Sequence, residues 1–298
     1  MSEPQQAGPS GSEPAPQRQT TPFLVLQFFI FPMAIVAVCV SVFVIFGLIA
    51  SEGKSARDYL GEVRSGSANR RWQAAFELSK ALLAKKDPVL ADPAFVAELV
   101  ALFEESGNDD PRVRRYLALT LGRLADPRAV PALLDALRPA DAAASDSETQ
   151  IYAIWALGAI RDPAALPELV RLAQSDDAGM RKAATHALGA FAGPQAHAAL
   201  SRALSDATED VRWNAALALA RRGERAAGPV LLQMLDRQGL SQVPGLGEEQ
   251  REEALLAAVR VSTGLRDPAL RSALEDLRAG DPSLKVREAA RVALDQLR

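Results

Sequence analysis

The sequence contains one cysteine and two histidines among 298 residues, and aromatic residues make up only 5% of it. A single cysteine excludes an internal disulfide and any metal site built from several cysteines. The formal net charge is −3, so the chain lacks the positive field on which nucleic-acid binding depends, and we expect no nucleic-acid partner. Hydrophobic residues make up 48%, which is enough for one sizeable folded region.

Residues that could carry catalysis are scarce. Cys39 lies in an apolar N-terminal stretch, which leaves His186 and His197 as the unusual reactive side chains of the remaining sequence. The sequence shows no glycine-rich phosphate-binding loop and no serine, histidine and aspartate set. Carboxylates are plentiful, but no pair of them stands out. We therefore expect no catalytic residues, no cofactor and no metal ion.

Charge is absent from residues 23–50, and 19 of these 28 residues are Leu, Ile, Phe or Val. About 20 apolar residues suffice to cross the hydrocarbon core of a bilayer. A cleaved signal peptide would be shorter and would follow several basic residues, whereas only Arg18 precedes this segment. The sequence therefore predicts a single transmembrane helix over residues 23–50.

Basic residues follow this segment and are nearly absent before it; they are Lys54, Arg57, Arg64, Arg70 and Arg71. The positive-inside rule then predicts a single-pass protein of the cell membrane with its C-terminal part in the cytoplasm. Residues 1–22 are rich in Pro, Ser, Gly and Gln, which predicts a disordered tail. Residues 51–68 are interpreted as a polar connector with one possible helical patch, "ARDYLGEV".

The rest of the chain is built from a repeated pattern. Segments aligned on a Val-Arg pair, with a Leu eight residues after the Val, begin at Arg70, Val113, Thr149, Met180, Val211, Gln250 and Val286. Their starts lie 31 to 43 residues apart, and periods of this size indicate a solenoid.

Each repeat has the pattern of two helices. In the first helix, Val113, Leu117, Leu121 and Leu124 recur with helical spacing. The second begins at Asp92-Pro93, Asp126-Pro127, Asp162-Pro163, Gly193-Pro194 and Asp267-Pro268. Aspartate accepts hydrogen bonds from the free N–H groups of a helix start, and proline fits the next position. Helices this short must be buried against neighbours to persist, so we expect an all-α superhelical solenoid over residues 69–298.

The stretch "DPRVRRYLALTLGRLADPRAVPALLDAL", residues 110–137, resembles the HEAT-like repeat of the phycobilisome-lyase type. The cues are the Val-Arg start, the Leu-Gly pair and the Asp-Pro start of the second helix. In similar solenoids the second helices line the concave face, where partners bind. Related hydroxylases hold iron with His-Glu pairs, whereas here His186 and His197 precede Ala187 and Ala198.

Arginine recurs just after the repeat start; the residues are Arg71, Arg114, Arg181, Arg212, Arg251 and Arg287. Acids precede several of them, namely Asp110, Asp177, Asp210 and Asp281. The resemblance implies an Asp–Arg ladder between neighbouring repeats, and an anion-binding arginine row is the alternative. The seventh helix position holds Phe76, Leu119, Trp155, His186 and Leu217. We interpret it as a core position.

Polar residues on the second helices are the candidate partner-binding residues: Arg128, Asp135, Glu168, Arg171, Gln195, Arg202 and Gln233. Four of them share one position of successive repeats and should form a ridge on the concave face. The expected function is a non-catalytic, membrane-tethered scaffold or adaptor that binds a protein partner. The alternatives are a lyase- or hydroxylase-related enzyme acting on a protein-bound group, and an accessory subunit of a respiratory or transport complex.

Overall fold

The computed structural model describes residues 30–50, 54–82, 89, 92–138 and 146–297, and the predicted disordered tail lies outside these residues. The chain forms two compact units, Met1–Lys54 and Ser55–Arg298. Within the described residues, both units contain helices and no β-strand.

The first unit contains helix α2 (Phe31–Ala50), whose large apolar side chains between Ile30 and Ile45 are exposed. No helix in the described part of the chain meets the length and apolar character needed to cross a membrane. The structure therefore does not support the predicted transmembrane helix. The helix α2 covers residues 31–50 of the predicted span. Residues 23–29 lie outside the described residues.

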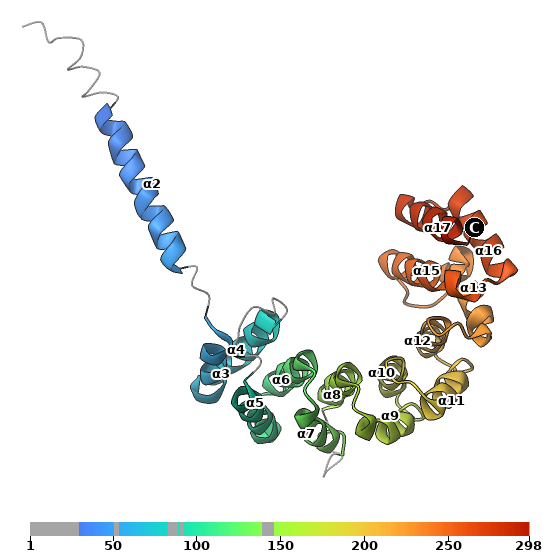
Figure 1. Cartoon of the computed structure of the whole chain (residues 1–298), viewed down its shortest axis with the longest axis horizontal. Coiled ribbons are helices and arrows are strands. Elements are labelled where there is room, and N and C mark those ends of the chain that lie inside the picture. The colour runs from blue at the N-terminus through green and yellow to red at the C-terminus, as the bar shows by residue number, and fades with distance from the viewer. Residues whose placement is uncertain (1–29, 51–53, 83–88, 90–91, 139–145, 298) are drawn as a thin grey trace, which may run out of the picture. The chain divides into compact units, whose positions relative to one another are not determined.

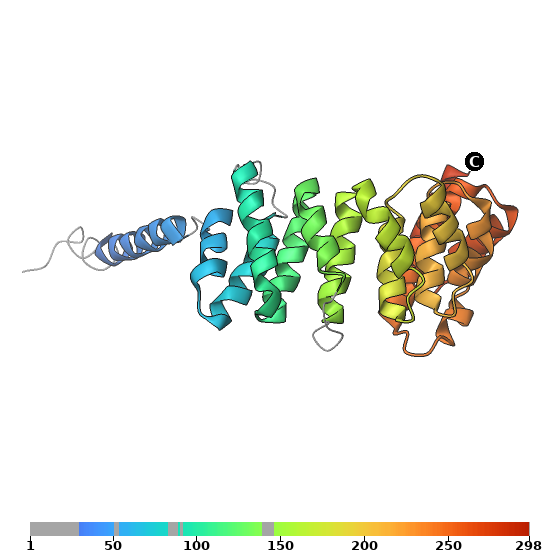
Figure 2. The ribbon, with the colours of Figure 1, turned by 90° about the horizontal axis from the view of Figure 1, so that it is seen from below.

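The second unit is an array of helices in two rows (Figures 1 and 2). The first row holds the first helix of each repeat: α4 (Ala68–Ala81), α6 (Pro111–Leu124), α8 (Ser147–Ile160), α10 (Ala178–Leu188), α12 (Glu209–Ala220), α15 (Glu248–Ser262) and α17 (Leu284–Gln296). The second row holds α3 (Ala56–Ser65), α5 (Pro93–Glu105), α7 (Val130–Asp135), α9 (Leu166–Leu172), α11 (Pro194–Ala203), α13 (Gly228–Leu235) and α16 (Pro268–Gly280). The prediction of an all-α repeat solenoid is confirmed.

The predicted Asp-Pro pairs start the second-row helices α5 and α16 directly, and they start the short 3₁₀ turns that lead into α7 and α9. The Asp92 carboxylate accepts from the backbone N–H of Ala94 at 2.9 Å, and Asp162 accepts from that of Ala164 at 2.8 Å. Each bond satisfies a donor that the helix itself leaves free. Gly193 replaces the aspartate before α11, with a φ of 99° that favours glycine.

The expected connector over residues 51–68 needs a correction, because residues 56–65 form α3 and belong to the solenoid. Ala56, Leu60 and Val63 are buried along one face of α3, at the spacing of an amphipathic helix. Ser55 and Asp58 form a capping box that fixes the helix start. α3 packs on α4 and so provides the first helix of the second row.

Glycine allows the first-row helices to approach one another closely. A Cβ atom at Gly122 would lie 2.7 Å from Cα of Ala156 on the next helix, and one at Gly158 would lie 2.8 Å from Cα of Ala187. At Gly189 the nearest atom of the next helix, Cβ of Ala218, would be 3.1 Å away. Second-row neighbours make fewer contacts with one another. Closer packing in one row bends the array toward that row.

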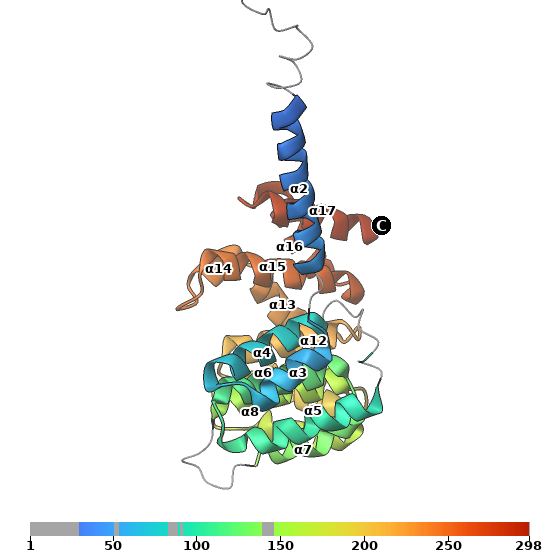
Figure 3. The same cartoon turned by 90° about the vertical axis from the view of Figure 1, so that its left-hand side faces the viewer.

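The curvature places the first row on the inner side of the arc and the second row on its outer side (Figures 1 and 3). This corrects the expectation that second helices line the concave face. The core lies between the rows and is filled by side chains with no exposed surface, such as Leu117, Leu133, Leu157, Leu169 and Leu188.

Because the first-row helices approach so closely, we predict that one added methyl group at their contact lowers the stability of the fold. Gly158→Ala should lower the free energy of unfolding by about 1–3 kcal/mol, because its Cβ meets Cα and Cβ of Ala187 and the helices must move apart. Gly61→Ala is the matched control on α3, where a Cβ meets nothing within 4 Å. It should raise stability by about 0.5–1 kcal/mol through helix propensity. Urea unfolding followed by circular dichroism measures both, and equal effects would contradict the packing argument.

Candidate functional site

The seventh position of the first-row helices forms a surface stripe, not a core column. Phe76 and Trp155 are 36% and 38% exposed. His186 is also exposed, and Leu119 and Leu217 are half-buried. We call these five residues the inner stripe. The earlier interpretation was wrong because, at 3.6 residues per turn, position seven lies opposite positions one, five and nine, which fill the core.

Aromatic contacts hold parts of the inner stripe in place. The rings of Phe76 and Tyr116 meet edge to face with centroids 5.2 Å apart, and the Lys80 ammonium lies 5.0 Å from the Phe76 centroid. Trp155 rests near Gly122, where a Cβ atom would come within 3.0 Å of its ring. The glycine that brings α6 and α8 together therefore also makes room for the tryptophan.

The two histidines lie on different helices, His186 on α10 and His197 on α11. Partial burial, and then the positive charge of Arg221, lower the pKa of His186. His197 is half-buried on α11, with its Nε2 3.4 Å from the Ser201 hydroxyl. Within the described residues there is no group of three or more His, Cys, Asp or Glu side chains that could hold a metal ion.

Arginines of one repeat bind carboxylates that precede the next first-row helix. The pairs are Arg71–Asp109 at 2.5 Å, Arg115–Asp146 at 2.7 Å, Arg181–Asp206 at 2.8 Å and Arg237–Asp281 at 2.7 Å. The predicted ladder therefore exists, and Arg71 and Arg181 are in it. The Arg181 guanidinium donates two bonds to Asp206 and lowers the pKa of that carboxyl.

Several partners in the ladder differ from those predicted. Asp110 and Asp177 cap their own helices by accepting from the N–H groups of Arg112 and Met180. Asp210 pairs with Lys182. Arg114 packs on the ring of Phe103, 5.2 Å from its centroid, and burial lowers the pKa of this arginine. Acidic residues close together in the sequence look equivalent, but the position of each one in the turn decides which of them faces the neighbouring repeat.

The sequence-predicted partner residues all lie on the second row, which is the outer side of the arc. Arg128 pairs with Asp126 and donates to the carbonyl of Pro93 at 3.0 Å, and Arg171 pairs with Glu168 at 2.6 Å. The others occupy successive second-row helices: Asp135 on α7, Gln195 and Arg202 on α11, and Gln233 on α13. All are exposed except Glu168, which is half-buried. A role in partner binding stays a prediction.

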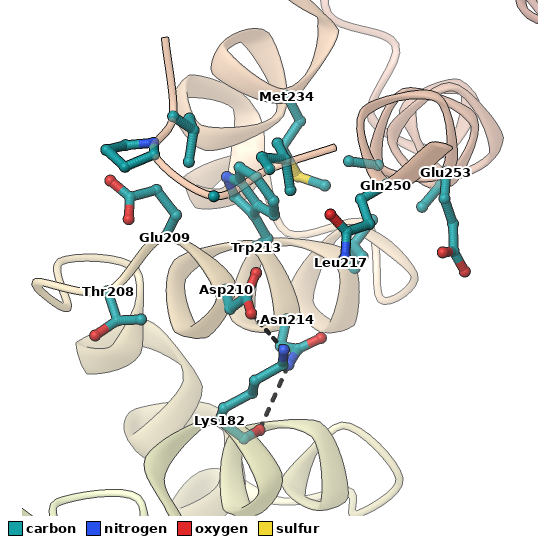
Figure 4. A pocket seen from close by; sticks show the side chains of 16 residues that line it. Lys182, Thr208, Glu209, Asp210, Trp213, Asn214, Leu217, Met234, Gln250 and Glu253 are labelled. Atoms are coloured by element: carbon teal, nitrogen blue, oxygen red, sulfur yellow. Dashed lines mark hydrogen bonds and ion pairs between the residues drawn. The ribbon is translucent and has the colours of Figure 1, made fainter. Parts of the chain in front are cut away.

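A groove of about 630 Å³ lies between α12 and α15 (Figure 4). Apolar side chains line it, among them Trp213, Leu217, Met234, Val243 and Leu246. Polar lining residues include Lys182, Glu209, Asp210, Asn214 and Glu253. Trp213 is 8% exposed and lies between Glu209 on one side and Glu253 on the other (Figure 4).

The groove forms where the pattern of one glycine per first-row helix ends, which is at α12. The Leu-Gly pair of α6, α8 and α10 becomes Leu219-Ala220 on α12, and α12 contacts α15 less than it contacts α10. The segment between α13 and α15 contains the short helix α14 (Arg237–Ser241), and Val243 to Leu246 close one edge of the groove. The groove was not predicted from the sequence. The change from Gly to Ala is the signal that could have shown it.

Comparison with known proteins agrees with the repeats. The HEAT-repeat family matches residues 140–210, and the PBS lyase HEAT-like repeat matches residues 113–138 and 211–237. The chain therefore contains HEAT and PBS lyase HEAT-like repeats. No curated protein sequence matches it.

Similar solved structures include the complex of CpcE and CpcF of phycocyanin lyase from Nostoc, with 21% identity and a TM-score of 0.53 over 84% of this chain and 97% of that one. That likeness supports the fold. YibA of E. coli is 15% identical with a TM-score of 0.49, covering 85% and 96% of the two chains. Human deoxyhypusine hydroxylase is 20% identical with a TM-score of 0.34, covering 81% and 95%.

The ladder predicts a pH-dependent contribution to stability. Asp206→Asn should lower the free energy of unfolding by about 1–2 kcal/mol at pH 7, because Arg181 loses its carboxylate. The pKa of Asp206 is lowered in the folded state, so its contribution is complete above about pH 4, the unfolded value, and is lost as pH falls through the folded value.

The difference between wild type and Asp206→Asn should therefore shrink below about pH 4 in urea unfolding. Asp276→Asn is the control, since Asp276 is exposed on α16 and should change stability by less than about 0.5 kcal/mol. A difference that stays constant from pH 7 to pH 3 would contradict the assignment.

Proposed function

We propose that the solenoid is a non-catalytic scaffold that binds a segment of a protein partner along its inner face, through the inner stripe. The observation that carries this proposal is the exposure of Phe76 and Trp155 on a curved face that is otherwise tightly packed. Grouped apolar side chains on a surface mark interaction sites, and aromatic residues dominate the energy of protein interfaces.

The inner face suits a partner segment for a second reason. Its backbone is fixed by interlocked helices and by the Asp–Arg ladder, so the stripe is held in place before binding. A rigid surface loses little conformational freedom when a partner is bound. The alternative is an enzyme related to lyases, acting on a protein-bound group. The likeness to the phycocyanin lyase complex favours it at the level of fold, and a tetrapyrrole bound to the purified protein would support it.

The proposal includes attachment to the cell membrane through residues 23–50, with the solenoid in the cytoplasm. Its support is the uncharged sequence of this segment, the exposed apolar side chains of α2 and the basic residues that follow. Tethering raises the local concentration of the solenoid near membrane partners without new contacts. An accessory subunit of a respiratory or transport complex would use the same segment to pack against other helices.

Removing the aromatic groups tests the inner stripe. In the variant Phe76→Ala/Trp155→Ala, recovery of partners crosslinked to the full-length protein in native membranes should fall at least about tenfold, since aromatic hot spots each contribute about 2 kcal/mol or more. Quantitative mass spectrometry of the crosslinked material measures the loss. The variant Arg171→Glu/Arg202→Glu, which reverses two charges on the outer side, should leave the same partners unchanged. Loss only in the outer variant would move the binding surface to the second row.

Extraction tests the membrane attachment. The full-length protein should stay in the membrane fraction after alkaline carbonate and enter solution with mild detergent, because the apolar segment favours the bilayer by about 6 to 11 kcal/mol in summed transfer free energy. A variant with Val36 and Val40 replaced by Lys should be recovered in the soluble fraction, whereas Ser substitutions at the same positions should not change the distribution. Wild-type protein released by carbonate alone would refute the attachment.

A further inference from the structure

The groove between α12 and α15 has more negative than positive side chains around it. Its lining includes the carboxylates of Glu209, Asp210 and Glu253 and one ammonium group, that of Lys182. The ammonium is bound to Asp210, and Glu209 accepts a bond of 3.2 Å from Arg212 on its own helix. Glu253 is exposed and is in no ion pair with another described residue. The groove therefore retains a carboxylate that is available to an external cation.

The floor of the same groove is apolar. Trp213 and Met234 lie side by side in the close-up, with Leu217 below Gln250 and near α15 (Figure 4). Leu217 is also a member of the inner stripe, so the groove continues that surface toward the N-terminal ends of α12 and α15. An occupant therefore meets apolar atoms below it and carboxylates at its sides.

We propose that this groove binds a basic, apolar segment of the protein partner, with an apolar side chain against Trp213 and Leu217 and a Lys or Arg beside Glu253. The proposal rests on the proposed function, because it assigns a chemical class to a partner of the same inner face. The match is one of charge and shape: Lys and Arg lay an apolar stem along an aromatic floor and carry the charge to a carboxylate at the rim. The bonds they form with carboxylates are stronger than neutral ones.

The same features disfavour other ligands. A nucleic acid, an acidic peptide or a phosphate would bring negative charge to Glu209 and Glu253 and gain only Lys182, whose charge Asp210 already balances. A purely apolar segment would fill the floor but bury the rim without a cation, at the cost of removing Glu253 from water.

Peptides of one length test the chemistry directly. The full-length protein in mild detergent is titrated into fluorescein-labelled peptides that repeat Lys-Leu-Leu-Lys, Glu-Leu-Leu-Glu or Lys-Ser-Ser-Lys, and anisotropy is recorded. We expect the first to bind at least about tenfold tighter than the other two, and to weaken as salt rises from 50 to 500 mM. Equal binding of the acidic peptide, or no binding of the basic apolar one, would overturn the proposal.

Matched substitutions on one helix locate the site. Glu253→Gln should weaken the basic apolar peptide about three- to fivefold, and Glu209→Gln/Glu253→Gln about tenfold. Glu249→Gln removes the same charge one turn away on α15, from a residue that does not line the groove, and should change affinity less than twofold. If Glu253→Gln and Glu249→Gln behave alike, the groove is not the site.

The failure of this inference is separable from failure of the proposed function. Phe76→Ala/Trp155→Ala should leave peptide affinity unchanged, since neither residue lines the groove. If partner recovery depends on the inner stripe but peptide affinity does not change in Glu253→Gln, only the groove proposal is refuted. If peptide binding depends on Glu253 but Phe76→Ala/Trp155→Ala still recovers every partner, the proposed function of the inner stripe is refuted and the groove remains the binding site.

Discussion

The packing of neighbouring first-row helices at Gly122, Gly158 and Gly189 is the constraint on which the shape of the solenoid depends. Helices that approach at a backbone without a side chain come closer than the second-row helices behind them, and the array must curve toward the glycines. The curvature decides which row is concave. The inner stripe, the groove and the predicted partner residues of the second row all take their positions from these glycine contacts.

Charge complements this packing and fixes the order of the repeats. Each rung of the ladder joins an arginine to a carboxylate at the start of the next first-row helix, across a sequence separation of 25 to 44 residues. Arg237–Asp281 is the most protected, with the aspartate side chain 1% exposed. Such bonds add geometric specificity, because the two parallel bonds that a guanidinium donates hold the carboxylate in its plane. The electrostatics therefore support one register of stacking, and the apolar core supplies most of the free energy.

Much of the fold can be predicted from the sequence, because repeat spacing, apolar periodicity and Asp-Pro starts are local signals. Residues 56–63 were predicted only as a possible helical patch within a connector, although Ser55 and Asp58 form a capping box that marks a helix start. The site was harder to predict. The seventh position holds Phe76, Leu119 and Trp155. Apolar residues at one aligned position give the same sequence pattern whether they face the core or the concave surface. Only the angular position relative to Val113, Leu117 and Leu121 separates the two cases. The resemblance to similar solenoids placed the second helices on the concave side, whereas here the glycines place them outside.

The glycine contacts also restrict how this sequence can change. A methyl group at Gly158 meets Ala187 itself, so the residue accepted at one position depends on the size of the residue across the interface. Substitutions at the two positions are then not additive, in contrast to changes at distant sites. Each interlocked pair of helices is thus a two-position unit of variation, whereas Ala220 on α12 already departs from the glycine pattern.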